Sequence, residues 1–454
     1  MQTRRDNAQS EMMLLPSLEE RIPRDYYLRR VNRVLDLSFV HDVVRDRYCQ
    51  DTCPPQGFGR RDGRPSIDPE VIVRLFLLQA IMGTASVREL LDEMDMHLGY
   101  RWFIGDGPSE PVPDHSTLSK ALTRFGDEVF QRSIRQCRRS GLIRGRLLHV
   151  DATTIRADID RDRVHKPDSS DPDARFGRFP HGRKEPGYKQ QTVVDNQSRV
   201  VLAVSVMPAN VGEGGTIVAA VDDAIHRGEL AKPPEAGCAD SAYASGANRS
   251  ACEQRGIRLV SPPRQGRNHH RAGQFTIERF AYDEQQDVFI CPSGKRLVKA
   301  GRFSGKGKRR RYRASIRDCR VCSRKAEWTR SPQRCVNVSA HHAALVRLRA
   351  DSQTMSFRQV YRRRAPVIEG IFAEAKQWHG LYRVGRRGLA KVRMQCLLIA
   401  AVLNFKRLAA AFARIYFTGE VVLRVLGGLL NLLRAFWRKI PVYGHRCLRP
   451  PPIS

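Results

Sequence analysis

The sequence predicts an α/β protein: a mixed sheet flanked by helices, with an all-helical N-terminal domain and a β-rich insertion. Apolar residues recur at helical spacing in the first part, and near residue 146 the period changes to that of buried strands. Expected strands then alternate with helices, as in α/β folds, until a long polar stretch interrupts them. The expected parts are a helical domain (1–142), the sheet domain in two pieces (143–262 and 345–412), the insertion (263–344) and an amphipathic tail (413–454).

The N-terminal part shows the signals of capped helices. "SIDPEVIVRLFLLQAIMG" has Asp68 as a helix cap and Pro69 at the first helical position. "SVRELLDEM" carries a capping box from Ser86 to Glu89, and "DHSTLSKALTRFG" begins another capped helix. Short helices joined by tight turns fit a helix-turn-helix that reads DNA ends, and they fit equally a small bundle that packs on the next domain.

The sheet domain begins with "LLHVDATTI", an apolar and β-branched strand with Asp151 near its end. "YKQQTVVD" and "RVVLAVSVMP" predict a hairpin, and "EAGCADSAY" predicts a short strand that runs out at Asp240. Helices are expected over "TIVAAVDDAIHRG" and "GANRSACEQRG", with a last strand at "IRLVSPP". After the insertion, one helix is expected to begin near Pro366 and a second to span "LAKVRMQCLLIAAVLNFKRLAAAF".

Charge is the strongest compositional signal. The 454 residues include 79 Lys and Arg against 47 Asp and Glu, a formal charge of +32, and 41% hydrophobic residues are enough for a sizeable core. Such an excess attracts phosphate backbones, so nucleic acid is the expected partner. A structural RNA binder, or a protein from an Arg-rich proteome, is the alternative. The most cationic run, "GRFSGKGKRRRYRASIRD", makes Arg309, Arg310 and Arg311 candidate DNA contacts.

Neither a membrane nor an oxidising compartment is expected. The longest apolar stretches are short and interrupted by Gln395, Arg424 and Asn431, and the N-terminus lacks the apolar core of a signal peptide. Eleven cysteines, an odd number, are typical of reduced thiols in a cytoplasm or nucleoid. The insertion carries four that can form a zinc ribbon or remain inert thiols, whereas Cys49 and Cys53 lack evident partners; the four are Cys291, Cys319, Cys322 and Cys335.

Three carboxylates are expected near the rim of the sheet where the strand ends converge, which is where α/β sheets bind ligands: Asp151, Asp240 and Glu369. Together they can hold two Mg²⁺ ions, which would let an acidic group attract phosphate within a basic segment. Singly, each has a simpler explanation, since an Asp after a strand often caps a turn and a Glu in a first helical turn complements the helix dipole. On a helix, Lys376 shares a stripe with Glu369, whereas Glu374 is rotated by about 140°.

The motifs "HVDATTIRADI", "CADSAYASGANRSACEQRGI" and "YRRRAPVIEGIFAEAKQWHGLYRVGRRGLAKVR", with the N-terminal "GRPSIDPEVIVRLFLLQAIMG", resemble bacterial insertion-sequence transposases with a DDE triad. The resemblance covers about 14 to 410. It implies an RNase H-like domain that cuts DNA at terminal inverted repeats and joins it to a target, with Mg²⁺ (or Mn²⁺ in its place) and a homodimer on paired ends. The triad falls on Asp151, Asp240 and Glu369.

The resemblance also implies a Tyr-Arg-Glu-Lys signature that contacts DNA, formed by Tyr361, Arg364, Glu369 and Lys376. Arg364 lies one residue farther from the Glu than in some members. Related transposases often carry cysteines in the insertion, with the last one closer to the pair, near where Trp328 stands here.

Other functions remain open at this stage. Another RNase H-like nuclease, such as a junction resolvase, and a catalytically silent transposase-derived DNA-binding protein both fit part of the pattern. Trp378 and His379 either stack on a flipped base or, for Trp378, fill the core.

Overall fold

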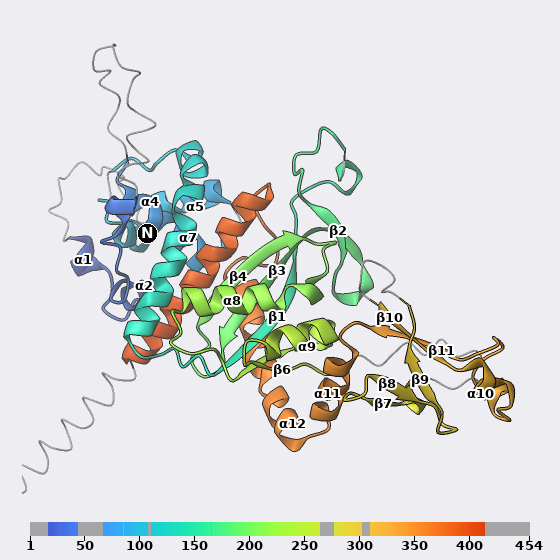
Figure 1. The fold of residues 1–454 in the computed structure, drawn as a ribbon. Coiled ribbons are helices and arrows are strands. Elements are labelled where there is room, and N and C mark those ends of the chain that lie inside the picture. Colours follow the sequence, from blue (N-terminus) through green and yellow to red (C-terminus); the bar gives the residue numbers. More distant parts are fainter. Residues whose placement is uncertain are drawn as a thin grey trace, which may run out of the picture.

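The structure is a computed structural model that describes residues 17–43, 67–84, 86–107, 110–164, 166–263, 277–301 and 309–413. Helices lie at one end, a mixed sheet in the middle and a second, smaller sheet at the other end (Figure 1). The predicted tail after residue 413, Cys49 and Cys53 lie outside the described residues.

The N-terminal part is helical as predicted. Its caps are those that the sequence indicates: the Asp68 side chain accepts from the amide of Glu70 (2.7 Å), and Ser86 Oγ accepts from the amide of Glu89 (3.0 Å). Asp114 caps the longest of these helices in the same way. The helices are α1 (Leu18–Arg21), α2 (Tyr27–Asn32), α4 (Pro69–Met82), α5 (Val87–Met96), α6 (Leu98–Ile104) and α7 (His115–Arg139).

The main sheet is mixed. The strands run in the order β4-β3-β1-β5-β6, in which β3 is antiparallel to both neighbours and β5 and β6 are parallel to β1. A further short strand, β2, pairs with the start of β3 and was not predicted. The bounds are β1 (Leu147–Arg156), β2 (Arg175–Arg178), β3 (Lys184–Asp195), β4 (Val201–Pro208), β5 (Ala236–Ala239) and β6 (Arg258–Val260).

Helices cover both faces of this sheet. α8 (Ile217–Arg227) packs on β4, β3 and β1, and α9 (Gly246–Glu253) packs beside it on β6. α12 (Met355–Arg362) inserts Phe357 against Ala236 and Cys238 from the other side. Because successive strand residues point to opposite faces, β5 presents alternate residues to the two helical layers.

The predicted insertion contains a second sheet of five antiparallel strands in the order β11-β10-β9-β8-β7. It has its own core, built around Phe289, Tyr312 and Trp328. The bounds are β7 (Ala281–Asp283), β8 (Val288–Ile290), β9 (Arg296–Lys299), β10 (Arg309–Ala314) and β11 (Cys335–Ser339), with α10 (Ile316–Arg320) between the last two.

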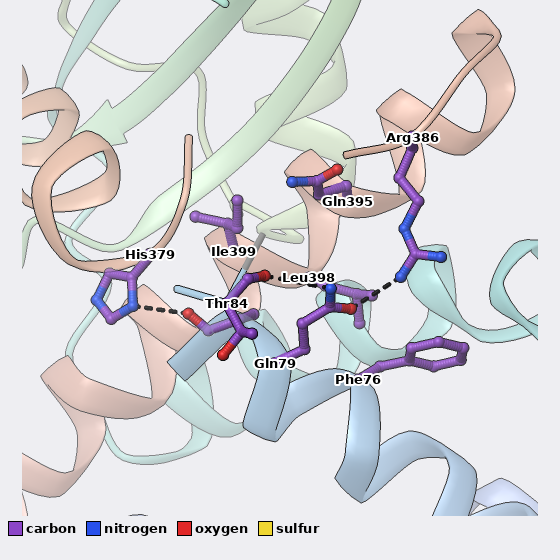
Figure 2. Close-up of a pocket in the computed structure, with 9 residues that line it drawn as sticks. Phe76, Gln79, Thr84, His379, Arg386, Gln395, Leu398 and Ile399 are labelled. Carbon is purple, nitrogen blue, oxygen red and sulfur yellow. Dashed lines mark hydrogen bonds between the residues drawn. The ribbon is translucent and has the colours of Figure 1, made fainter. Parts of the chain in front are cut away.

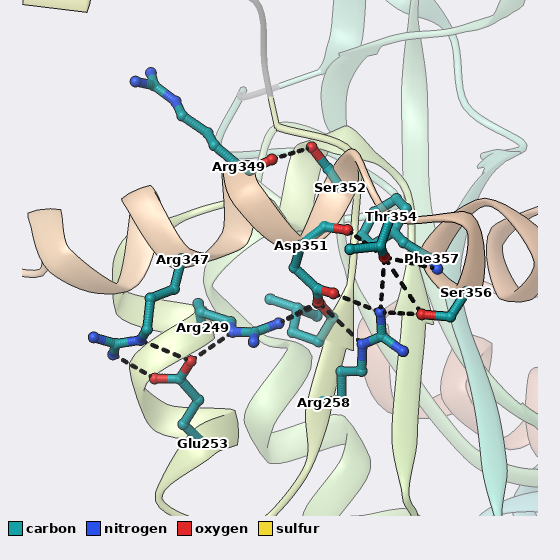
Figure 3. Close-up of polar contacts among 11 residues, drawn as sticks. Arg249, Glu253, Arg258, Arg347, Arg349, Asp351, Ser352, Thr354, Ser356 and Phe357 are labelled. Carbon is teal, nitrogen blue, oxygen red and sulfur yellow. Dashed lines mark hydrogen bonds and ion pairs between the residues drawn. The ribbon is translucent and has the colours of Figure 1, made fainter.

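An ion-pair network ties this region to the main sheet (Figure 3). Asp351, at the end of α11 (His342–Ser352), accepts hydrogen bonds from Arg258 on β6 and Arg249 on α9. Arg347 on the same helix binds Glu253 and, beyond it, Glu284 next to β7. Because these carboxylates are shared between several guanidinium groups, α9, β6, α11 and the β7–β8 turn are held as one unit.

The helix expected to begin near Pro366 begins at Ala365, one residue before it. α12 leads into a π-helical turn, Ala365–Glu369, which continues as α13 (Gly370–Trp378). Pro366 therefore lies within a helical segment, where it has no N–H to donate to the preceding turn. A π turn is a known way to accommodate such an interruption. The last helix, Leu389–Ala413, matches the prediction closely.

Most of the chain shares one hydrophobic core. The N-terminal helices, both layers around the main sheet and the helix Leu389–Ala413 contribute to it. At the seam between α4 and the C-terminal helices, His379 Nδ1 lies 2.8 Å from the carbonyl of Ala80, and Arg386 donates to Gln79 Oε1 (2.8 Å; Figure 2). Gly83 ends α4 with φ +70°, and an added Cβ would lie 2.6 Å from the carbonyl of Trp378. The helical part therefore packs directly on the sheet domain.

By length and composition, the helix Leu389–Ala413 is apolar enough to cross a membrane, and the bent pair α4–α5 passes the same test together. However, 61% of the most apolar window of Leu389–Ala413 is buried inside the protein. Its apolar side chains are thus part of the core.

Candidate active site

Asp151 lies on β1, the central strand of the main sheet. Its neighbours Leu148 and Val150 are fully buried in the main core, and alternation turns Asp151 to the opposite face, where the π turn approaches β1. The carboxylate is largely buried, with 16% of the side chain exposed. The pKa of Asp151 is raised to about 6, chiefly by burial and also by the charges of Asp240 and Glu369, while the charge of Arg364 opposes this rise.

Asp240 follows β5, the strand next to β1. Its side chain caps the 3₁₀ turn Ser241–Tyr243 by accepting from the amide of Ala242 (2.9 Å). Ser261 Oγ donates to the backbone carbonyl of Asp240 (2.5 Å) and so fixes the backbone there. The cap role that the sequence allowed is therefore real, and Asp240 is still close enough to act on the charge of Asp151.

Glu369 is the last residue of the π turn, and its side chain is 61% exposed. Ile368 and Ile371, on either side of it, are buried. Arg364 precedes Glu369 by five residues. In a regular α-helix this spacing would turn the two side chains about 140° apart. The wider π turn leaves Arg364 Nη1 3.5 Å from Glu369 Oε1.

Arg364 connects two of the three carboxylates. Its Nη2 donates to Asp151 Oδ2 (2.6 Å), while Nη1 faces Glu369. Only 9% of Arg364 is exposed. The resemblance implied that Arg364 contacts DNA. In this structure it is instead buried and paired with acidic groups, because the π turn directs it toward β1.

The three carboxylates gather without yet forming a set of metal ligands. Among the residues that the structure describes, no group of three or more His, Cys, Asp or Glu side chains is arranged to hold a metal ion. The physical reason at this place is Arg364, which takes up the oxygen of Asp151. The donor set itself, three carboxylates of which one is buried, suits a hard divalent cation such as Mg²⁺.

Glu374, the rival third carboxylate, has a structural role. It pairs with Lys406 (2.5 Å) and Arg407 on the helix Leu389–Ala413, and it lies 3.9 Å from His379. Burial alone would raise its pKa, but these cationic partners hold the pKa well below its usual range. Glu374 therefore joins two helices and faces away from Asp151.

The other residues considered for DNA contact lie on the helical segments on either side of Glu369. Tyr361 is half-buried beside Phe357, with ring centroids 6.2 Å apart. Lys376 is half-buried, and burial lowers its pKa. Trp378 is 61% exposed, so its assignment to the core was wrong. His379 is buried at the seam and bonded to the carbonyl of Ala80, which leaves it unable to stack on a base.

Two family models match the chain. One, described as a transposase domain (DUF772), covers residues 16–124, and the other, a transposase DDE domain, covers 290–409. The chain belongs to the DDE transposases. It is therefore an enzyme that cleaves DNA and transfers strands. Glu369 falls within the second match, and Asp151 and Asp240 fall between the two matches.

Solved structures add only distant likenesses. A piggyBac transposase synaptic complex with hairpin DNA is 11% identical, with a TM-score of 0.38 over 85% of this chain and 74% of that one. A Mos1 transposase paired-end complex is 14% identical, with a TM-score of 0.17 over 44% and 61% of the two chains. A Mos1 mariner paired-end complex with Mn is 12% identical, with a TM-score of 0.17 over 50% and 67%. A search of curated proteins gives no match.

The transposase has further polar residues at this place that the sequence analysis missed. Thr192 and Gln190 on β3 pair directly with Asp151 and Thr153 on β1, so they share the face of Asp151. Both are buried, and Gln190 Oε1 has no hydrogen-bond partner. The signal was available in "YKQQTVVD", where Gln190, Gln191 and Thr192 follow one another in a predicted strand of the sheet.

The basic strand β10 of the transposase's insertion exposes two of its three predicted DNA contacts, Arg309 and Arg311, on one face. Arg309, Arg311 and Arg313 are exposed on one face of β10, which we call the β10 arginine face. None of them forms an ion pair with a carboxylate of the described residues. Arg310 points to the other face and pairs with Asp287 (3.4 Å), so its contact with DNA stays a prediction.

The four cysteines of the insertion are not arranged as zinc ligands in the part of the chain that the structure describes. Cys291 is buried in the insertion core, and Cys319 and Cys322 pack against that core. Backbone amides donate to two of these sulfurs: that of Lys295 to Cys291 (3.3 Å) and that of Arg334 to Cys319 (3.5 Å). Trp328 fills the centre of the same core. All four cysteines are free thiols.

Proposed function

We propose that the chain is the transposase of an insertion sequence, which cuts DNA at terminal inverted repeats and joins the cut ends to target DNA. The observation that carries the proposal is the meeting of Asp151, Asp240 and Glu369 at one place, from β1, the end of β5 and the π turn. The mixed sheet, flanked by helices on both faces, supports an RNase H-like catalytic domain.

In this proposal Asp151, Asp240 and Glu369 hold two Mg²⁺ ions, with Mn²⁺ as a substitute. Bound there, the ions would activate the attacking water or 3′-hydroxyl and stabilise the leaving oxygen. The chain's own residues set the conditions: Asp151 is fixed by a central strand, Asp240 by its amide contact, and Glu369 remains exposed for DNA to approach. Lys376, half-buried two turns along the same helix, is positioned to grip a phosphate.

DNA binding in this proposal uses two separate surfaces. In the first, Tyr361, Lys376 and the exposed Trp378, which lie on the helical segments before and after Glu369, would contact the transposon end. The β10 arginine face lies on the second sheet and would contact the phosphate backbone. Cutting two ends together calls for a homodimer on paired ends, and the site of action is the cytoplasmic nucleoid.

The test is cleavage of a labelled duplex carrying the element's own terminal repeat, with Mg²⁺. Glu369→Gln is expected to bind the duplex normally and to lose cleavage by more than about a hundredfold, comparable to the loss of one transition-state-stabilising group. The matched control is Glu374→Gln on the same helix. It removes an equal charge, contacts Lys406 and Arg407 rather than Asp151, and should cut at temperatures where it stays folded.

If both variants cut like the wild-type protein, Glu369 is only a helix residue and the proposed triad is wrong. If Glu374→Gln alone loses cleavage while remaining folded, the third carboxylate has been assigned to the wrong position.

A further inference from the structure

A single guanidinium group lies among the proposed catalytic carboxylates. Arg364 Nη2 is 2.6 Å from Asp151 Oδ2, and Nη1 is 3.5 Å from Glu369 Oε1. The side chain is nine-tenths buried, so this contact is a fixed part of the site rather than a passing surface pair. Arg364 therefore supplies positive charge where three carboxylates repel one another.

The Arg364 side chain is incompletely satisfied in this position. Its Nε is buried and has no hydrogen-bond partner, and the contact to Glu369 is long for a charged hydrogen bond. A fully paired guanidinium would place two nitrogens on one carboxylate. Arg364 instead spans two carboxylates, and its Nε donates to neither. An anion that accepts hydrogen bonds from more of its nitrogens would therefore bind it better.

The Asp151 oxygen that Arg364 contacts is also an atom that a divalent cation would use as a ligand. A guanidinium nitrogen 2.6 Å from that oxygen excludes a metal ion from the same lone pair. The released guanidinium would need an anion with oxygens in a planar fork, and a DNA phosphate has that chemistry. Arg364, a metal ion and a phosphate are thus linked through the same atoms.

We propose that Arg364 is an exchangeable internal cation. In the metal-free protein it neutralises Asp151 and Glu369, and binding of a divalent cation to these carboxylates releases it to a phosphate of the bound DNA. The inference rests on the proposed function, because it requires these carboxylates to be the metal ligands. It makes Arg364 a positioning residue that couples metal binding to DNA binding.

The first test measures Mn²⁺ binding to the full chain without DNA, by electron paramagnetic resonance of the free ion. Arg364→Gln should bind Mn²⁺ on the order of tenfold more tightly than the wild type, because the competing cation is gone. Arg363→Gln is the matched control, since it removes the same charge from the exposed neighbouring residue. It should change the affinity by less than about twofold, because its charge is screened by solvent.

Equal effects of Arg364→Gln and Arg363→Gln, or weaker Mn²⁺ binding by Arg364→Gln, would overturn the exchange. Asp151→Asn is measured in parallel. If Asp151→Asn binds Mn²⁺ as the wild type does, the proposed metal site itself is wrong, a failure distinct from that of the exchange. If Arg364→Gln shows no cooperative thermal transition, Arg364→Lys replaces it. A single ammonium cannot span both carboxylates, so binding tighter than wild type is expected and wild-type affinity refutes the proposal.

The second test concerns the phosphate. Fluorescence anisotropy of a labelled duplex is measured with and without Ca²⁺, which occupies oxygen sites. The wild type should bind DNA more tightly when Ca²⁺ is present, and Arg364→Gln should lose most of that gain. An equal gain in both proteins would mean that the released side chain does not reach the phosphate.

Discussion

Asn404 offers a sharp test of how the helical part and the main sheet are joined. It is fully buried on the helix Leu389–Ala413. Its side-chain amide accepts from the Val201 N–H (2.8 Å) and donates to the Val201 carbonyl (2.9 Å) and to Ser133 Oγ (3.1 Å). Because β4 is an edge strand, the Asn404 amide satisfies backbone groups that would otherwise have no partner.

Asn404→Leu keeps the size of the side chain and removes all three hydrogen bonds. The Val201 N–H and carbonyl would stay buried without these partners, at about 1–3 kcal/mol each. The added apolar surface offsets part of this loss, up to about 2 kcal/mol. The net expectation is a decrease of about 3 kcal/mol in the free energy of unfolding, which lowers Tm by about 6 °C at roughly 2 °C per kcal/mol.

The assay is thermal and urea unfolding followed by circular dichroism. Asn337→Leu, at an exposed position on β11, is the control and should change stability by less than about 0.5 kcal/mol. If Asn404→Leu is as stable as the wild type, the edge of β4 does not depend on this amide. The joint between α7, β4 and the last helix would then be purely hydrophobic.

Two further predictions concern charge. Burial favours the neutral form of Asp351, but the hydrogen bonds and charges of Arg258 and Arg249 outweigh it and hold the pKa below its usual value. The charged form of Asp351 therefore contributes about 2 kcal/mol to stability above pH 4, and this contribution is lost as the pH falls through the lowered pKa. In Asp351→Asn, Tm should depend less on pH on the acid side. If the curve of Tm against pH were unchanged, the prediction would be contradicted. Replacing the three residues of the β10 arginine face by serine should reduce the slope of log K for DNA against log salt by about 2.7, or about 0.9 per contact. Arg310 is paired with Asp287, so Arg310→Ser should leave that slope unchanged. If Arg310→Ser changed the slope as much as each substitution in the β10 arginine face does, this face would not be the DNA surface.

Local signals in the sequence predicted most elements correctly. The caps at Asp68 and Ser86 and the last helix are set by short-range rules, and the structure confirms them. The short strand β2 was missed because four residues between loops carry no period, and its existence depends on pairing with β3. The helix start near Pro366 is confirmed to within one residue, but no local signal indicates that its first turn is a π turn.

The site was harder to predict than the fold, since its contacts join distant segments. The pairing of Arg364 with Asp151 spans 213 positions along the chain, and no local pattern indicates it. Trp378 has the apolar character of a core residue and lies near the stripe of Ile371 and Ala375, yet it is the last residue of α13 and is 61% exposed. Sequence reasoning named the three carboxylates and left open what neutralises them.

The π turn has a consequence for how such a motif is recognised. An added residue in a regular helix would rotate everything before it by about 100° relative to everything after it. Here the π turn takes up one residue more than an α-helical turn, and the side chains of Arg364 and Glu369 still meet although they are five positions apart. The interval along the chain therefore does not predict how close the side chains of Arg364 and Glu369 lie. A search that demands a fixed interval would pass over the signature, whereas the directions in which the two side chains point still identify it.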